Sequence, residues 1–213
     1  MIKPLIGVCL ALAPLGSVVG AQEAEDRSLG NLETQVSQEH RGAPRPGKRP
    51  AVVGLSGQTG GEVRDGSPWT SASLKDAVSM LVYVDPDEKD LNEDLAKRLK
   101  AEKFDHQYFK SVAIINMKAT WKPNAILNAM LKRKQESYPD TLYVKDYDSV
   151  LVKEWGLADQ TYDVLLFDRE GQVLFRKDGK LSDQEIETFV SLVRDNLKDR
   201  SPRAEGPLDR VTL

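Results

Sequence analysis

The chain has 213 residues, of which 40% are hydrophobic and 30% are charged, and its formal net charge is -3. This length fits one globular domain with extensions and is too short for two large hydrophobic cores. Because the 33 acidic residues outnumber the 30 basic ones, there is no surplus of cations to bind phosphates, which argues against nucleic acid as a partner.

The first 21 residues are typical of a secretory signal peptide. Lys3 precedes an apolar run over residues 5–19, and small residues lead up to Ala21, so we expect cleavage after Ala21 and no stable membrane anchor afterwards. A transmembrane helix is disfavoured because Pro14 and Gly16 interrupt a stretch shorter than the roughly 20 residues that span a bilayer. A buried N-terminal helix is the alternative.

Removal of this segment takes away Cys9, the single cysteine of the chain. The exported protein would then have no disulfide, no thiolate nucleophile and no cysteine-based zinc site. His106 is the only histidine in the expected domain, because His40 precedes it. One imidazole cannot supply a metal cage, so we expect neither a metal nor a cofactor.

Two polar extensions flank the expected domain at residues 51–200. Residues 22–50 contain few apolar side chains and are rich in Glu, Gln, Arg, Gly and Pro, which predicts a flexible leader. Residues 201–213 contain Pro202, Gly206 and Pro207 and predict a flexible tail.

Strand patterns follow in chain order. Residues 51–55 and 62–63 flank Gly60 and Gly61 and predict a short hairpin or edge ribbon. Further strands are expected over residues 78–84, 112–116, 141–145, 163–168 and 173–176. The last two are separated by a short turn and predict an antiparallel hairpin.

Four helices are expected between and after these strands. The first has a leucine every fourth residue, the second begins at Pro123, and the third covers residues 150–155. Their expected apolar positions are Leu91, Leu95 and Leu99 in the first, and Ile126, Leu127, Met130 and Leu131 in the second.

The last helix has the clearest pattern. Its apolar residues are spaced for one helical face, namely Ile186, Phe189, Val190, Val193 and Leu197. Ser182 and Glu185 form the sequence signature of a capping box, and Leu181 is placed to contact Ile186. Alternating strands and helices predict an α/β fold with a mixed central sheet and helices on both faces.

This order of elements resembles the thioredoxin-like fold in its peroxiredoxin-type form, a three-layer sandwich with an N-terminal β-ribbon. More narrowly, the chain resembles the YtfJ family of periplasmic proteins, whose function is not established. The resemblance rests on the absent cysteines and on the motifs GKRP at 47–50, GGEV at 60–63, WGL at 155–157 and KDGKLS at 177–182. It implies this fold and a periplasmic location.

The resemblance also identifies where the redox site of the fold would lie. A reactive thiol would stand at the start of the first helix, where this chain has Asp85, Asp87, Glu88 and Asp90 but no cysteine. The cis-proline that faces the thiol corresponds to Tyr162. Both parts of the redox site are missing, so the resemblance implies no thiol-disulfide oxidoreductase or peroxidase activity.

The acidic stretch has two interpretations. Its carboxylates could cap the helix and compensate the helix dipole. A calcium site is disfavoured, because Lys89 and Asp90 occupy positions where an EF-hand requires a ligand and a glycine.

Ligands of open α/β sheets bind beyond the carboxyl ends of the parallel strands. On the expected topology this edge gathers Asp85, Asp87 and Glu88 with Trp121 and Tyr162. Acids beside aromatic rings could bind a cationic side chain or a peptide, although Trp121 and Tyr162 could simply pack the loops.

The sequence therefore favours an exported binding or scaffold module for a protein or peptide partner. A cysteine-independent enzyme that acts on a small molecule at the same edge is the alternative, although no catalytic residue can be identified. A third possibility is a domain retained for assembly through its N-terminal ribbon.

Overall fold

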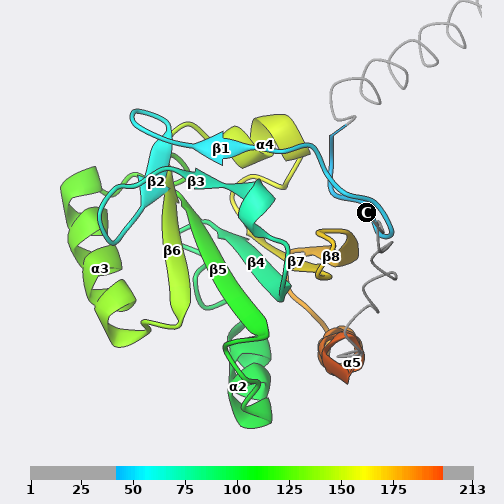
Figure 1. Ribbon diagram of the computed structural model, residues 1–213. Helices are drawn as coiled ribbons and strands as arrows, with labels where there is room; N and C mark the ends of the chain where they lie inside the picture. Colours follow the sequence, from blue (N-terminus) through cyan, green and yellow to red (C-terminus); the bar gives the residue numbers. More distant parts are fainter. Residues whose placement is uncertain (1–41, 199–213) are drawn as a thin grey trace, which may run out of the picture. The chain divides into compact units, whose positions relative to one another are not determined.

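The computed structural model describes residues 42–198 (Figure 1). The expected signal peptide, most of the expected leader and the expected tail lie outside these residues. The elements are β1 (Gly54–Leu55), β2 (Gly60–Glu62), β3 (Trp69–Thr70), the 3-10 helix η1 (Ser71–Ser73), β4 (Val78–Val84), α2 (Glu93–Glu102), β5 (Phe109–Asn116), α3 (Asn124–Ser137), β6 (Thr141–Asp146), α4 (Val150–Trp155), β7 (Tyr162–Phe167), β8 (Val173–Asp178) and α5 (Asp183–Lys198). Among the described helices, none is long and apolar enough to cross a membrane.

Within residues 42–198, the main sheet has six strands in the order β2-β6-β5-β4-β7-β8. Strands β4, β5 and β6 are parallel, whereas β2, β7 and β8 pair antiparallel with their neighbours. The expected mixed sheet and the terminal β7–β8 hairpin are therefore confirmed. Strand β4 is central and almost wholly buried, which explains why its sequence, VSMLVYV, is apolar without strict alternation.

Residues 51–55 and 62–63 do not pair as a hairpin, but β2 lies at the edge of the main sheet, as the alternative of an edge ribbon predicts. Strand β1 pairs with β3, and β2 pairs with β6 as an edge strand of the main sheet. Gly60 and Gly61 have φ angles of 151° and 145°, and a Cβ atom on Gly60 would lie 1.9 Å from the Lys145 carbonyl oxygen. The two glycines therefore allow the chain to approach β6 closely instead of forming the turn of a hairpin.

Alternate residues of the strands face two separate cores. One core contains apolar residues of α2, α3 and α5, including Leu95, Leu127 and Phe189. The other contains α4 together with β1 and β3, including Trp155 and Leu55. Helices thus cover both faces of the sheet (Figure 1), which confirms the three-layer arrangement.

Helix α3 buries only one stripe of side chains. Leu127 and Leu131 lie in the core, whereas Ile126 and Met130, which we expected there, are 54% and 48% exposed. The buried stripe continues to Gln135, whose side chain donates to the Thr141 carbonyl oxygen at 2.8 Å and accepts the Tyr143 N–H at 3.1 Å. Two adjacent apolar stripes occur in this helix, and the sheet can cover only one of them.

The capping box of α5 is confirmed. The Ser182 N–H donates to Glu185 Oε2 at 2.8 Å, and the Glu185 N–H donates to Ser182 Oγ at 3.3 Å. Leu181 and Ile186 are both buried in the same core. Local sequence alone fixes this helix start because its two partners are three residues apart.

Candidate functional site

Three loops meet at the carboxyl edge of the parallel strands. They are the acidic turn after β4 (85–90), the loop after β5 (117–123) and the loop before β7 (156–161). The loop before β7 reaches this edge because β7 runs antiparallel to β4. The residues expected to form a site therefore do gather at one edge of the sheet.

Asp85 connects the acidic turn to the loop before β7. Its N–H donates to the Thr161 carbonyl oxygen at 2.9 Å, and its Oδ1 accepts the Asp87 N–H at 2.8 Å. The side chain is buried, and this burial raises the pKa of Asp85 above its ordinary value. Asp85 thus holds the turn in place and contributes little exposed charge.

Asp87 connects the same turn to the loop that carries Trp121. Its carboxylate forms an ion pair with Lys122 and accepts the Thr120 hydroxyl at 2.8 Å. The hydrogen bond from Lys122 holds the pKa of Asp87 below its ordinary value. Both partners flank Trp121, which is 85% exposed, so a large aromatic ring projects from a loop that is anchored on both sides.

Tyr162 and Glu88 lie in different environments. Tyr162 pairs with Val84 in the sheet and packs against the core of α2, α3 and α5. Its burial raises the pKa of the Tyr162 hydroxyl to about 12. Glu88 is exposed, as are Trp121 and Asp87, whose side chain is 39% exposed.

The acidic turn does not cap α2. The helix begins at Glu93, and the residues from Asp85 to Asp90 lie in the turns before it. The side chain of Asn92 donates to the Gly179 carbonyl oxygen at 3.1 Å and accepts the Leu181 N–H at 2.9 Å. The start of α2 is thus tied to the loop before α5, a long-range contact without a local sequence signal.

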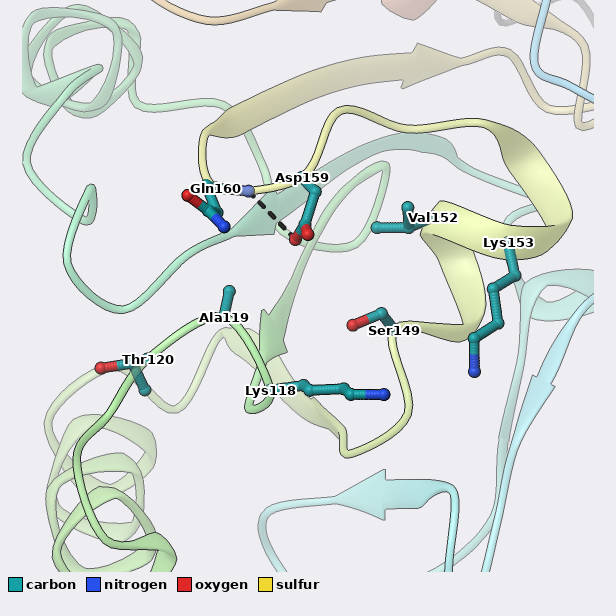
Figure 2. A pocket seen from close by; sticks show the side chains of 8 residues that line it. All are labelled: Lys118, Ala119, Thr120, Ser149, Val152, Lys153, Asp159 and Gln160. Carbon is teal, nitrogen blue, oxygen red and sulfur yellow. Dashed lines mark hydrogen bonds between the residues drawn. The ribbon is translucent and has the colours of Figure 1, made fainter.

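A pocket of about 450 Å³ opens between the loop after β5, the loop before β7 and the start of α4 (Figure 2). Sequence reasoning identified none of its lining residues, which are Lys118, Ala119, Thr120, Ser149, Val152, Lys153, Asp159 and Gln160. Ser149 and Gln160 have φ angles of 53° and 56°. Non-glycine residues rarely adopt this left-handed conformation, and strained residues of this kind are often found at functional sites.

A buried hydrogen-bond network lies behind the pocket. Ser149 Oγ donates to Asn116 Oδ1 at 2.9 Å, and Asn116 Nδ2 donates to Asp159 Oδ1 at 3.0 Å. Asn116 is 1% exposed and ends strand β5. It therefore fixes two lining residues of the pocket relative to the sheet.

Asp146 holds the start of α4, next to the pocket. This fully buried carboxylate accepts the N–H groups of Val150 and Leu151 at 3.0 and 3.2 Å, together with the Tyr83 hydroxyl at 3.1 Å. It therefore supplies the side-chain cap of α4, because the side chain of Ser149, the residue just before the helix, makes no capping hydrogen bond. Burial raises the pKa of the Tyr83 hydroxyl, which stays protonated and donates to Asp146.

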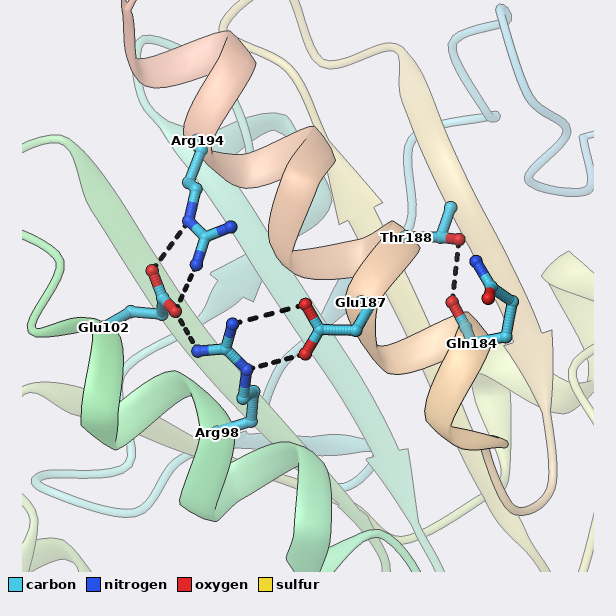
Figure 3. Close-up of polar contacts among 6 residues, drawn as sticks. All are labelled: Arg98, Glu102, Gln184, Glu187, Thr188 and Arg194. Atoms are coloured by element: carbon cyan, nitrogen blue, oxygen red, sulfur yellow. Dashed lines mark hydrogen bonds and ion pairs between the residues drawn. The ribbon is translucent and has the colours of Figure 1, made fainter.

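An ion-pair network holds α2 against α5 (Figure 3). Glu102 binds both Arg98 and Arg194, with 2.5 Å between Arg194 Nη2 and Glu102 Oε1. Arg98 also binds Glu187, with 2.8 Å between Nε and Oε1. The network fixes the helix that follows the acidic turn.

Residues 42–198 contain no cysteine and no cis peptide bond. They also contain no cluster of three side chains that could bind a metal ion. Tyr162 thus stands in a trans backbone where the related redox proteins are expected to have a cis-proline. The chemistry available at this edge is that of carboxylates, lysines, hydroxyls and one exposed indole.

Sequence comparison identifies relatives over most of this domain. The profile of the family described as "Bacterial protein of unknown function (YtfJ_HI0045)" matches residues 62–196. An uncharacterized protein of Haemophilus influenzae is 32% identical over 130 residues, which cover 59% of this chain and 70% of that protein. The uncharacterized protein YtfJ of Escherichia coli is 26% identical over 133 residues, which cover 61% and 72% of the two chains.

Structural comparison confirms the expected fold. The thiol peroxidase from Chromobacterium violaceum is similar with a TM-score of 0.53 and 12% identity, covering 73% of this chain and 89% of that one. A candidate thiol:disulfide interchange protein, DsbE, from Chlorobium tepidum is similar with a TM-score of 0.50 and 16% identity, covering 73% and 99%. The chain therefore has a thioredoxin-like fold of the peroxiredoxin type.

Proposed function

The chain belongs to the YtfJ family of bacterial proteins of unknown function, and we propose that it is an exported thioredoxin-like binding module that lacks redox activity. Its partner is a protein or peptide that docks at the carboxyl edge of the sheet. Its location is the periplasm, after cleavage of the signal peptide behind Ala21. It needs no cofactor and no nucleic acid.

One observation carries this proposal: the 85% exposed indole of Trp121 in a loop anchored by Asp87. A fully exposed tryptophan is unfavourable in water, and tryptophan is enriched among residues that dominate binding energy at protein interfaces. A loop held in one conformation also loses less entropy on binding. Glu88 adds an accessible carboxylate for a cationic side chain, in the acidic turn that Asp87 connects to the Trp121 loop.

Capture of partners by variants tests the docking site. Trp121→Ala should reduce capture from periplasmic extract at least tenfold, because loss of a hot-spot aromatic typically costs about 2 kcal/mol or more. Tyr138→Ala is the matched control, since Tyr138 is another exposed aromatic at the far end of α3. Equal capture by both variants would contradict the proposed site.

The absence of redox activity has its own test. Purified chain without residues 1–21 should reduce neither insulin disulfides nor peroxide above the buffer rate, because no thiol remains to attack either substrate. Measurable turnover by this protein would overturn the proposal.

The pocket supports a second candidate function, a cysteine-independent enzyme acting on a small molecule. Lys118, Lys153 and Ser149 line it together with Asp159 (Figure 2). However, neither Asp85 nor Asp163, the carboxylic acids with a raised pKa, lines this pocket. A general acid or base with a suitable pKa is thus not identified there, and the binding module is better supported.

A further inference from the structure

The outer face of α3 is apolar in its first two turns. A surface helix normally carries polar residues opposite its buried stripe. On α3 the buried stripe contains Leu127 and Leu131. Ala125 and Ala129 lie opposite this stripe, and the exposed Ile126 and Met130 lie between the two. We call the exposed set the α3 outer patch; it consists of Ala125, Ile126, Ala129 and Met130.

Charges of opposite sign stand at the two ends of this patch. Beyond its N-terminal end lie Trp121 and the acidic turn, where Asp87 is paired with Lys122. The carboxylate of Glu88 has no side-chain partner among the residues that the structure describes. At the other end, Lys132 and Arg133 are exposed, and in the described part of the chain neither side chain forms an ion pair.

We propose that a second copy of this chain covers the α3 outer patch, with the two α3 helices antiparallel about a two-fold axis. The inference rests on the proposed function, because it names the partner that covers Trp121. A two-fold interface brings the same patch of both copies together. Each basic end then meets the acidic end of the other copy, so the surface is complementary to itself.

The positions of the residues along the helix agree with this arrangement. Arg133 follows Ile126 by seven residues and Met130 by three, so the three share one side of α3. An antiparallel pair centred on Asn128 places residue 133 of one copy opposite residue 123 of the other. This register places Arg133 at the Trp121 loop of the second copy, to which Asp87 connects the acidic turn with Glu88. A guanidinium there could contact both a carboxylate and an indole ring.

The interface should be weak. The small side chains of Ala125 and Ala129 allow the helices to approach closely, but one helix pair buries less than the roughly 1,200 to 2,000 Å² of a standard interface. We therefore expect a dissociation constant on the order of micromolar.

Sedimentation equilibrium of the chain without residues 1–21, over a concentration series spanning the micromolar range, tests the dimer. Met130→Glu should abolish dimerisation, because it places two carboxylates in the apolar centre of the interface. Val52→Glu is the matched control, since Val52 is 70% exposed and lies outside the patch, and it should dimerise like the unmodified chain. Thermal unfolding checks that both variants are folded.

Charge reversal tests the orientation. Glu88→Lys and Arg133→Glu should each weaken dimerisation about tenfold, because each opposes like charges at both ends of the interface. An equal mixture of the two variants should restore it, since both ends of the mixed dimer pair an acid with a base. A mixture that associates no better than either variant alone would overturn the antiparallel arrangement.

The outcomes distinguish this inference from the proposed function. A chain that stays monomeric over the whole series, or a dimer that survives Met130→Glu, would overturn the inference. A chain that stays monomeric over the series but captures a different periplasmic protein through Trp121 would support the proposed function and overturn the dimer. A dimer that is lost in Met130→Glu and restored by the charge-reversed mixture supports both.

Discussion

Replacement of Asp146 by alanine should be among the most destabilising single changes near the pocket. The carboxylate is fully buried and accepts the N–H groups of Val150 and Leu151, which begin α4. It also accepts the hydroxyl of Tyr83, a side chain that is 1% exposed. Alanine removes all of these acceptors and leaves the donors without a partner.

The expected magnitude follows from two separate losses. Loss of a helix cap costs about 0.5 to 2 kcal/mol. A buried hydroxyl left without a partner costs about 1 to 3 kcal/mol more. We therefore expect Asp146→Ala to lower the free energy of unfolding by about 1.5 to 5 kcal/mol.

A double-mutant cycle with Tyr83→Phe separates the two losses. In the unmodified chain Tyr83→Phe should cost about 1 kcal/mol, because it removes one hydrogen bond and leaves the cap intact. In the Asp146→Ala background the same change should be neutral or stabilising, since it removes a hydroxyl that has lost its acceptor. Urea unfolding with an unchanged m-value gives the four free energies.

Two results would refute this reasoning. A loss below about 0.5 kcal/mol for Asp146→Ala would mean that water or another group replaces the carboxylate. An equal effect of Tyr83→Phe in both backgrounds would mean that the hydroxyl and the carboxylate are not coupled. The first result would leave the hydrogen bond to Asn116 as the contact that holds Ser149 at the pocket.

Burial, followed by the neighbouring Asp178, raises the pKa of Asp163 to about 8. The stability that protonated Asp163 contributes is therefore fully present below its unfolded pKa of about 4 and is lost as the pH rises through about 8. Asp163→Asn should remove this decline in the free energy of unfolding, which urea unfolding above about pH 5 measures. A decline that persists in the variant would mean that another group causes it. The side chain of Glu102 is 12% exposed and binds two arginines, whereas that of Glu187 is 55% exposed (Figure 3). Glu102→Gln should therefore lower the thermal midpoint more than Glu187→Gln. Equal shifts in differential scanning calorimetry would show that burial of the network does not matter.

Much of the fold could be predicted because its signals are local. Strand β4 and helix α4 have the bounds that the apolar pattern predicts, Val78–Val84 and Val150–Trp155. The capping box of α5 needs only Ser182 and Glu185, which are three residues apart. Periodicity and short-range side-chain partners are sufficient for elements of this kind.

The failures have physical causes in tertiary structure. Strands β1 and β3 have two residues each, too few for a period, so their pairing could not be predicted. In α3, Ile126 and Leu127 belong to two adjacent stripes, of which only that of Leu127 is buried, and a pattern of apolar residues cannot tell which of two stripes the sheet covers.

The candidate site was predictable only in part for the same reason. The topology of parallel strands brings Asp85, Asp87 and Trp121 to one edge, and this follows from the element order. The pocket depends instead on the left-handed backbone conformations of Ser149 and Gln160. A serine or a glutamine in the sequence does not predict such a conformation. The pocket also depends on the Asn116 side chain, which joins two loops that are distant in sequence.

The geometry of the acidic turn is better suited to binding a partner than to catalysing a reaction. Asp85 is buried and Asp87 is neutralised by Lys122, so most of the turn's charge is used to hold the loops. Glu88, which forms no ion pair among the described residues, and the ring of Trp121 remain accessible, so this edge offers a partner both a carboxylate and an apolar surface. Because the loops are fixed before any partner arrives, binding requires little reordering, and neither exposed group can act as a strong nucleophile. A surface of this kind favours recognition over catalysis, and the exposed α3 outer patch extends it along the neighbouring helix.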